Sequence, residues 1–167
     1  GSGAADTLDF SNVTLNGIVS IGGGAGNDVI TGSISADLIL GGNDNDTLNG
    51  GDGDDVINGG TGTNLLNGGN GTDAAQYSGT AGSYSVSDNG DGTYALVGAG
   101  ISDTLASIEN LAFSDGTVTV ASRVGLGLTL TGTASAETLT GGGNADIITG
   151  LGGDDILSGN GGDDEFR

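Results

Sequence analysis

The chain has 167 residues, of which 22 are acidic and only two are basic, giving a formal net charge of −20. This balance excludes nucleic acid as a partner, because neutralising phosphates requires Lys and Arg, and it excludes attraction to an anionic membrane surface. The chain also lacks Cys and His, which excludes disulfides and the commonest zinc ligand. With 38 Gly, three Tyr and three Phe, a compact state needs bound counter-ions to offset its self-repulsion.

The first 22 residues predict short strands. The stretches DTLDFSNVTL (6–15) and IVSI (18–21) are rich in β-branched and aliphatic residues. We expect residues 1–22 to cover the open edge of the structure that follows, because an uncovered sheet edge exposes unpaired backbone groups.

A nine-residue repeat begins at Gly23. Six contiguous blocks span 23–76 and four more span 132–167. Position one is Gly in all ten blocks, position six is Asp in eight, and position eight is Ile, Leu or Phe in nine. A disordered Gly/Asp linker is the alternative interpretation when no cation is bound, but it has no reason to keep this phase.

Each block predicts a six-residue turn followed by a three-residue strand, whose middle residue points inward. Two blocks then make one flattened coil, and each strand lies parallel to the strand two blocks away, at about 4.8 Å. The predicted inward stripe is Ile30, Ile39, Leu48, Ile57, Leu66 and Ala75 in the first array, and Leu139, Ile148, Leu157 and Phe166 in the second.

The same stacking brings together the position-six carboxylates of blocks that are one coil apart. A hard cation between them would relieve their repulsion, and calcium fits because it accepts six to eight carboxylate and carbonyl oxygens in flexible geometry. Magnesium fits less well, and soft metals have no ligands here. The pairs predict up to about six calcium ions: Asp28/Asp46, Asp37/Asp55, Asp46/Asn64, Asp55/Asp73, Glu137/Asp155 and Asp146/Asp164.

The candidate sites differ in quality. Asp55/Asp73 and Asp146/Asp164 are the best by sequence, and turn carbonyls around Gly51, Gly53, Gly69 and Gly71 should complete the shells. Blocks 32–40 and 132–140 keep few turn glycines, and Asn64 lacks a charge. We expect poor or partial metal geometry in those two blocks.

The blocks resemble the G-G-x-G-x-D-x-U-x nonapeptide of the RTX (repeats-in-toxin) family, a calcium-binding pattern. Residues 77–120 also resemble a segment often found between or beside such arrays. The resemblance implies a parallel β-roll, export from a Gram-negative bacterium by type I secretion, and folding on meeting extracellular calcium.

The middle segment predicts two hairpins. SYSVS (83–87) and TYALV (93–97) flank DNGDG (88–92), and IENLAF (108–113) and TVTVA (117–121) flank SDG (114–116). We interpret DNGDG as a turn and not an EF-hand loop, because no Glu closes a 12-residue loop. The expected core of this segment is Tyr77, Tyr84, Tyr94, Leu111 and Phe113.

The predicted fold class is therefore all-β: two parallel β-roll arrays separated by a small antiparallel hairpin module. The domains are 1–22, 23–76, 77–131 and 132–167. We expect no enzyme activity, because carboxylate pairs that recur with every coil form an array and not a single active site. Any catalytic or adhesive domain of a parent protein would lie outside this chain.

Two functions stay open from sequence. The first is a calcium-binding module of an extracellular or surface bacterial protein, which folds on calcium and supports export and stability. The alternative is a structural cell-surface component, such as an adhesin segment, an S-layer or a self-assembling filament. Leu157 and Phe166, at the end of the second inward stripe, suggest self-association through the C-terminal coil.

Overall fold

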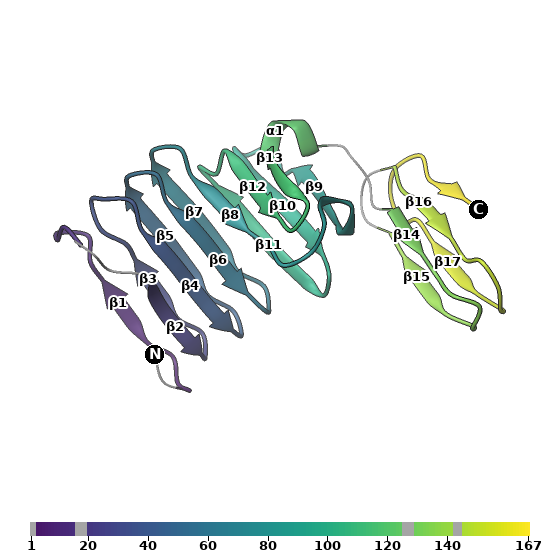
Figure 1. The fold of residues 1–167 in the computed structure, drawn as a ribbon, viewed down its shortest axis with the longest axis horizontal. Helices are drawn as coiled ribbons and strands as arrows, with labels where there is room; N and C mark the ends of the chain where they lie inside the picture. Colours follow the sequence, from purple (N-terminus) through teal and green to yellow (C-terminus); the bar gives the residue numbers. More distant parts are fainter. Residues whose placement is uncertain (1–2, 16–19, 125–128, 142–144) are drawn as a thin grey trace.

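Two facing β-sheets form most of the computed structural model, which describes residues 3–15, 20–124, 129–141 and 145–167 (Figure 1). One sheet has the order β1-β3-β5-β7-β11-β10-β9 and the other has the order β13-β12-β8-β6-β4-β2. The first comprises β1 (Thr7–Asp9), β3 (Val29–Thr31), β5 (Thr47–Asp52), β7 (Leu65–Asn70), β11 (Ile101–Ala106), β10 (Thr93–Gly98) and β9 (Tyr84–Asp88). The second comprises β13 (Gly116–Thr119), β12 (Asn110–Phe113), β8 (Ala74–Gln76), β6 (Val56–Gly60), β4 (Leu38–Asn43) and β2 (Ile21–Ala25).

The nine-residue repeat produces the predicted coil. Successive strands alternate between the two sheets, and each pairs in parallel with the strand two blocks away, as Ile30 does with Leu48 and Ile39 with Ile57. Every member of the first predicted stripe is at most 1% exposed. The all-β prediction with parallel coils is confirmed, and α1 (Val120–Arg123) is a single short α-helix among the described residues.

The strands of residues 38–70 are longer than the three residues predicted. β4, β5 and β7 have six residues and β6 has five, because the ladder continues into the next block. Gly42 pairs with Gly60, and Gly51 pairs with Gly69. Glycine has no side chain to hold neighbouring backbones apart, so these positions extend the pairing instead of ending it.

Strands outside the repeats continue both sheets. At one end β1 pairs in parallel with β3 and β2 with β4; Ile18 and Val19 of the predicted N-terminal strands lie outside the described residues. At the other end β11 pairs in parallel with β7 and β12 with β8. Segment 77–120 therefore adds one parallel strand to each sheet, and the antiparallel strands β10 and β9 extend the first sheet while β13 extends the second.

Both hairpins predicted for the middle segment are present, as β9/β10 and β12/β13. The rings of Tyr77, Tyr84 and Phe113 pack together with centroids 5.3–5.9 Å apart. Leu111 is fully buried, whereas Tyr94 is only partly buried. The strand β11 was not predicted, and it is the one that joins the first hairpin to the repeats.

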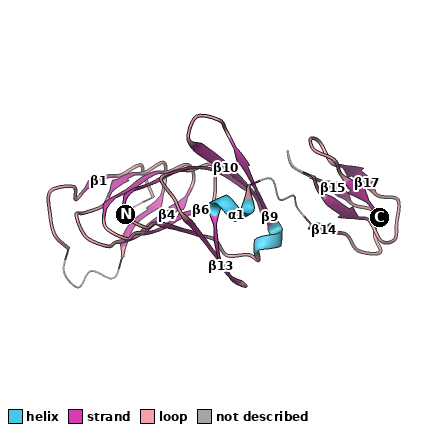
Figure 2. Ribbon diagram, turned by 90° about the horizontal axis from the view of Figure 1, so that it is seen from above, coloured by secondary structure: helices cyan, strands magenta, loops and turns pink. Residues whose placement is uncertain are grey.

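Arg123 links the end of the middle segment to its beginning through hydrogen bonds. Its Nη2 donates hydrogen bonds to the carbonyl oxygens of Ala81, at 2.7 Å, and Tyr84, at 2.6 Å. Figure 2 shows the two short helical segments involved, α1 and the 3₁₀ turn η1 (Ala81–Ser83), close to β9. No helix among the described residues has the length and apolarity to cross a membrane.

Residues 129–166 form two smaller sheets of the same design. One has the order β14-β16-β18 and the other pairs β15 with β17. Their bounds are β14 (Thr129–Thr131), β15 (Thr138–Thr140), β16 (Ile147–Thr149), β17 (Ile156–Ser158) and β18 (Glu165–Phe166). Ile148 is buried, but Leu139 and Leu157 are half-buried and Phe166 is 52% exposed. With few stacked coils, most of these side chains have a neighbour on one side only.

Candidate metal centre

The position-six side chains of residues 23–76 stack in two columns. Column A contains Asp28, Asp46 and Asn64, and column B contains Asp37, Asp55 and Asp73. In column B the backbone N–H of Asp37 donates to Asp55 Oδ1 and that of Asp55 to Asp73 Oδ1, both at 2.8 Å. Column A repeats the pattern at 2.8 and 2.9 Å. Each side chain thus orients the turn one coil earlier.

In most of these carboxylates the second oxygen has no hydrogen-bond partner among the described residues. Oδ2 of Asp28, Asp46, Asp55 and Asp73 is buried and has no hydrogen-bond partner in the part of the chain that the structure describes. These four residues are at most 2% exposed. A buried, unpaired carboxylate oxygen is costly, so the residues present fit a hard cation that would bind these oxygens.

The glycine at position one leaves room beside each spare oxygen. A Cβ on Gly50 would lie 2.1 Å from Asp55 Oδ2 and 2.4 Å from the Gly68 carbonyl oxygen. Gly41 faces the equivalent pair, Asp46 Oδ2 and the Gly59 carbonyl oxygen, at 2.4 and 2.6 Å. At both glycines, therefore, the carboxylate of the same block and a backbone carbonyl of the next coil converge on the space that a side chain would fill.

The glycine-poor turns satisfy their own carboxylates. Asp37 Oδ2 accepts the N–H of Ser33 at 2.6 Å, and Glu137 Oε2 accepts the N–H of Thr133 at 2.7 Å. The Thr133 hydroxyl also donates to Glu137 Oε1. These carboxylates have less need of a cation, and the partial metal geometry expected for blocks 32–40 and 132–140 stays a prediction.

Asn64 places an amide in column A where the other members have a carboxylate. Its Oδ1 accepts the Asp46 N–H, and its Nδ2 lies 2.6 Å from the Cβ position of Gly59, where the other turns present a carboxylate oxygen. An amide NH₂ is a donor and cannot bind a cation there. Nδ2 instead donates to Asp103 Oδ1 at 3.0 Å.

The four glycines predicted to supply carbonyls lie stacked in adjacent turns. Gly51 is the ladder partner of Gly69, and a Cβ on Gly71 would lie 2.0 Å from the Gly53 carbonyl oxygen. All four have φ between +105° and +147°. Within the described ranges no three acidic side chains are placed so that they could hold one metal ion together, so a metal shell here would combine two carboxylates with backbone carbonyls.

Residues 129–166 repeat the carboxylate stacking. The Glu137 N–H donates to Asp155 Oδ1 at 3.1 Å, and the Asp146 N–H donates to Asp164 Oδ1 at 2.9 Å. Residues 142–144, in the turn before Asp146, lie outside the described residues.

Two column members were missed from sequence. Asp103 accepts the backbone N–H of Asn64 at 3.0 Å, and Glu109 accepts that of Asp73 at 2.8 Å. Asp103 is 1% exposed. They lie 39 and 36 residues after their partners, outside the repeat, so the nine-residue period gives no signal for them.

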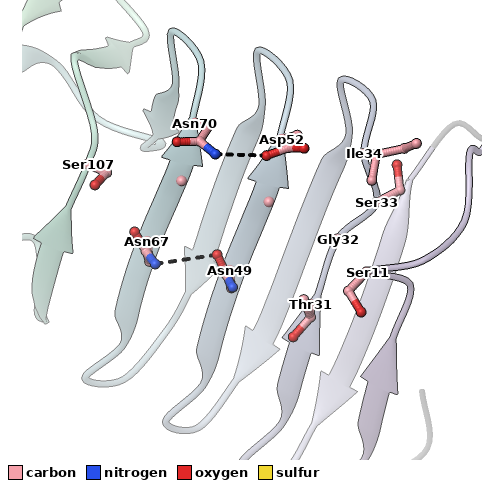
Figure 3. Close-up of a pocket in the computed structure, with 12 residues that line it drawn as sticks. Ser11, Thr31, Gly32, Ser33, Ile34, Asn49, Asp52, Asn67, Asn70 and Ser107 are labelled. Carbon is pink, nitrogen blue, oxygen red and sulfur yellow. Dashed lines mark hydrogen bonds between the residues drawn. The ribbon is translucent and has the colours of Figure 1, made fainter.

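A hollow of about 490 Å³ lies on the outer face of β5 and β7. Figure 3 shows its polar rows, in which Asn67 donates to Asn49 at 3.4 Å and Asn70 to Asp52 at 2.9 Å. Each bond joins side chains 18 residues apart, one between two amides and one from an amide to a carboxylate, so these polar groups partner one another across adjacent coils.

The stability of the calcium-free protein should fall as pH rises. Burial raises the pKa of Asp55 from 3.8 to about 6, helped by nearby carboxylates, of which Asp73 acts most strongly. Between about pH 4 and 6 the folded chain then holds a proton that the unfolded chain has released, so the stabilisation present at pH 4 is lost through pH 6. Far-UV circular dichroism in EDTA from pH 4 to 8 measures the folded fraction, and a β-signal that grows as pH rises would contradict this expectation.

Comparisons with known proteins agree with this geometry. A sequence model of the RTX calcium-binding nonapeptide repeat, in four copies, matches residues 21–48, 40–74 and 131–166, which together are more than half of the chain. Among solved structures, the extracellular lipase LipA from Serratia marcescens is similar with a TM-score of 0.50 and 25% identity, over 85% of this chain. The match spans 29% of the lipase chain. Comparison with curated protein sequences finds no match.

Proposed function

The chain belongs to the RTX calcium-binding nonapeptide repeat family, and from this premise we propose that it is the calcium-dependent β-roll module of a secreted bacterial protein. Such repeats bind calcium and have a structural rather than a catalytic role. In our proposal the module stays unfolded at low calcium, passes through a type I secretion system and folds in extracellular calcium. The lipase activity of the similar structure belongs to that protein and is not proposed for this chain.

One observation carries the proposal: four buried aspartates each keep an oxygen that has no hydrogen-bond partner among the described residues. We propose that these oxygens and turn carbonyls hold calcium, with Asp55 and Asp73 among the ligands of the best site. When bound, the ion supplies positive charge where the chain has none. The six stacked pairs set an upper limit of about six ions.

Chelation should unfold the module. Ordering costs about 1–2 kcal/mol per residue, and an inward stripe of one aliphatic residue per block is a thin core to offset it at a net charge of −20. Far-UV circular dichroism should therefore report disorder in EDTA and β-structure in calcium, while magnesium should restore little of it. The same β-signal in EDTA and in calcium would refute the proposal.

A self-assembling surface structure is the second candidate. It is favoured by apolar side chains on the strands of residues 129–166, where Ile156 is 66% and Phe166 is 52% exposed. If these side chains mediate assembly, sedimentation in calcium should show association that rises with concentration and weakens in Phe166→Ser. A wild-type monomer at every concentration would exclude this candidate.

A further inference from the structure

Column B does not end with the last nonapeptide. β12 pairs in parallel with β8, with Asn110 opposite Ala74, so Glu109 takes the place that a position-six residue would have one coil after Asp73. Glu109 Oε2 accepts the Asp73 N–H at 2.8 Å. The corresponding bond from Asp55 to Asp73 within the repeats has the same length.

Ser107 supplies the carbonyl that a position-one glycine supplies elsewhere. Within the repeats, the Cβ position of Gly50 lies 2.1 Å from Asp55 Oδ2 and 2.4 Å from the Gly68 carbonyl oxygen. At the junction between the last repeat strand, β8, and β12, the Cβ position of Gly68 lies 2.4 Å from Asp73 Oδ2 and 2.0 Å from the Ser107 carbonyl oxygen. Ser107 has φ +48°, a left-handed backbone that is uncommon for a residue other than glycine.

The junction holds negative charge that the protein itself does not balance. Asp73 is fully buried, and its Oδ2 has no hydrogen bond within the described structure. Burial raises the pKa of the Asp73 carboxyl, and the Glu109 charge acts in the same direction. Both arginines of the chain are engaged elsewhere, Arg123 with backbone carbonyls and Arg167 with Glu165.

The junction on column A is built differently. There Asp103 Oδ1 accepts both the backbone N–H and the side-chain Nδ2 of Asn64, each at 3.0 Å. The buried Tyr77 hydroxyl lies beside the same carboxylate, whose charge adds to burial in raising the pKa of Tyr77. In column A the Asn64 donors therefore bind Oδ1 of the last carboxylate, although Asp103 Oδ2 is buried without a hydrogen-bond partner among the described residues, as Asp73 Oδ2 is. In column B no donor side chain like that of Asn64 is present, because position six is occupied by Asp73.

We propose that Asp73, Glu109 and the Ser107 carbonyl form a calcium site outside the repeat motif, which fastens segment 107–119 to the roll. The site rests on the proposed calcium binding by the repeats. Glu109 is exposed, and with Ser107 it lines an open hollow of about 520 Å³, so an ion can enter from solvent. Figure 3 shows Ser107 on the segment that follows β7 in the stack.

The test compares Glu109→Gln with Asp115→Asn in the full chain. Glu109→Gln keeps an oxygen for the Asp73 N–H but removes the charge. Asp115→Asn makes the same charge change at the far end of β12 and keeps an acceptor for the Ala81 N–H, which Asp115 Oδ1 accepts at 2.9 Å. Bound calcium per chain is measured by equilibrium dialysis at saturation, and hydrogen exchange reports protection of residues 110–119.

We expect Glu109→Gln to bind one ion fewer than the wild type and to lose protection in 110–119, while Asp115→Asn matches the wild type. If Glu109→Gln does not fold in calcium, Glu109→Asp, which restores the charge, should recover the fold and the ion; failure to do so overturns the site. Equal ion counts in Glu109→Gln and wild type also overturn it. A wild type that binds no calcium overturns the proposed function instead, so the two failures are distinct.

Discussion

Asp55→Asn should lower calcium affinity by about tenfold or more, and Asp37→Asn should lower it less. Asp55 lies between two stacked partners: it accepts from Asp37 and donates its backbone N–H to Asp73. Its spare oxygen is buried without a partner, whereas that of Asp37 already accepts the Ser33 N–H. Calorimetric titration of both variants measures the difference, and equal losses would contradict the stacked-pair arrangement of ligands.

The same variant should have the opposite effect without calcium. Asn at position 55 can still accept the Asp37 N–H but carries no charge, so it removes the cost of burying an unpaired carboxylate. Asp55→Asn should therefore show a larger folded fraction than wild type in EDTA by far-UV circular dichroism, and it should unfold at a lower temperature than wild type in saturating calcium. Asp54→Asn is the matched control: it makes the same charge change next door, and Asp54 is exposed and bonds the Thr72 N–H through an oxygen that Asn retains.

Much of the fold could be predicted because the spacing of the repeat determines how the strands pair. A nine-residue period with glycine, acid and aliphatic positions fixes a register of two blocks per coil, and Ile39, Ile57 and Ala75 pair in that register. The hairpin β9/β10 could be predicted too, because its strands alternate around a turn rich in Gly, Asp and Asn. In each case the information is local in the sequence.

The features that escaped prediction depend on contacts between distant residues. The strand β11 aligns Leu105 with Leu66, and this separation is not a whole number of nine-residue blocks. The partial metal geometry expected at Asp37 and Glu137 stays a prediction, and nothing in the sequence indicated the hydrogen bond that each carboxylate accepts from the second residue of its turn, Ser33 or Thr133. Strand length was wrong because Gly-Gly was interpreted as a turn signal, although stacked glycine pairs also extend a ladder.

Gly50→Ala should destabilise the calcium-bound protein by about 3 kcal/mol, at the upper end of the usual cost of overpacking. The added methyl group would lie 2.1 Å from Asp55 Oδ2 and 2.4 Å from the Gly68 carbonyl oxygen. The carbonyl belongs to a buried backbone and the carboxylate is held by the Asp37 N–H, so neither can move without breaking the stack. Calcium affinity should fall together with stability, because the displaced oxygens are two of the proposed ligands.

Gly82→Ala is the control for this substitution. Gly82 lies in the exposed turn η1, and a Cβ there meets nothing within 4 Å, so stability should be unchanged or slightly raised through the unfolded state. Urea unfolding in calcium compares the stability of the two variants, and far-UV circular dichroism compares their folded fractions in EDTA. If Gly50→Ala and Gly82→Ala were equally stable in calcium, the space over the position-one glycine would have to be large enough for a methyl group. In that case the convergence of carboxylate and carbonyl at this glycine could not be what holds the ion.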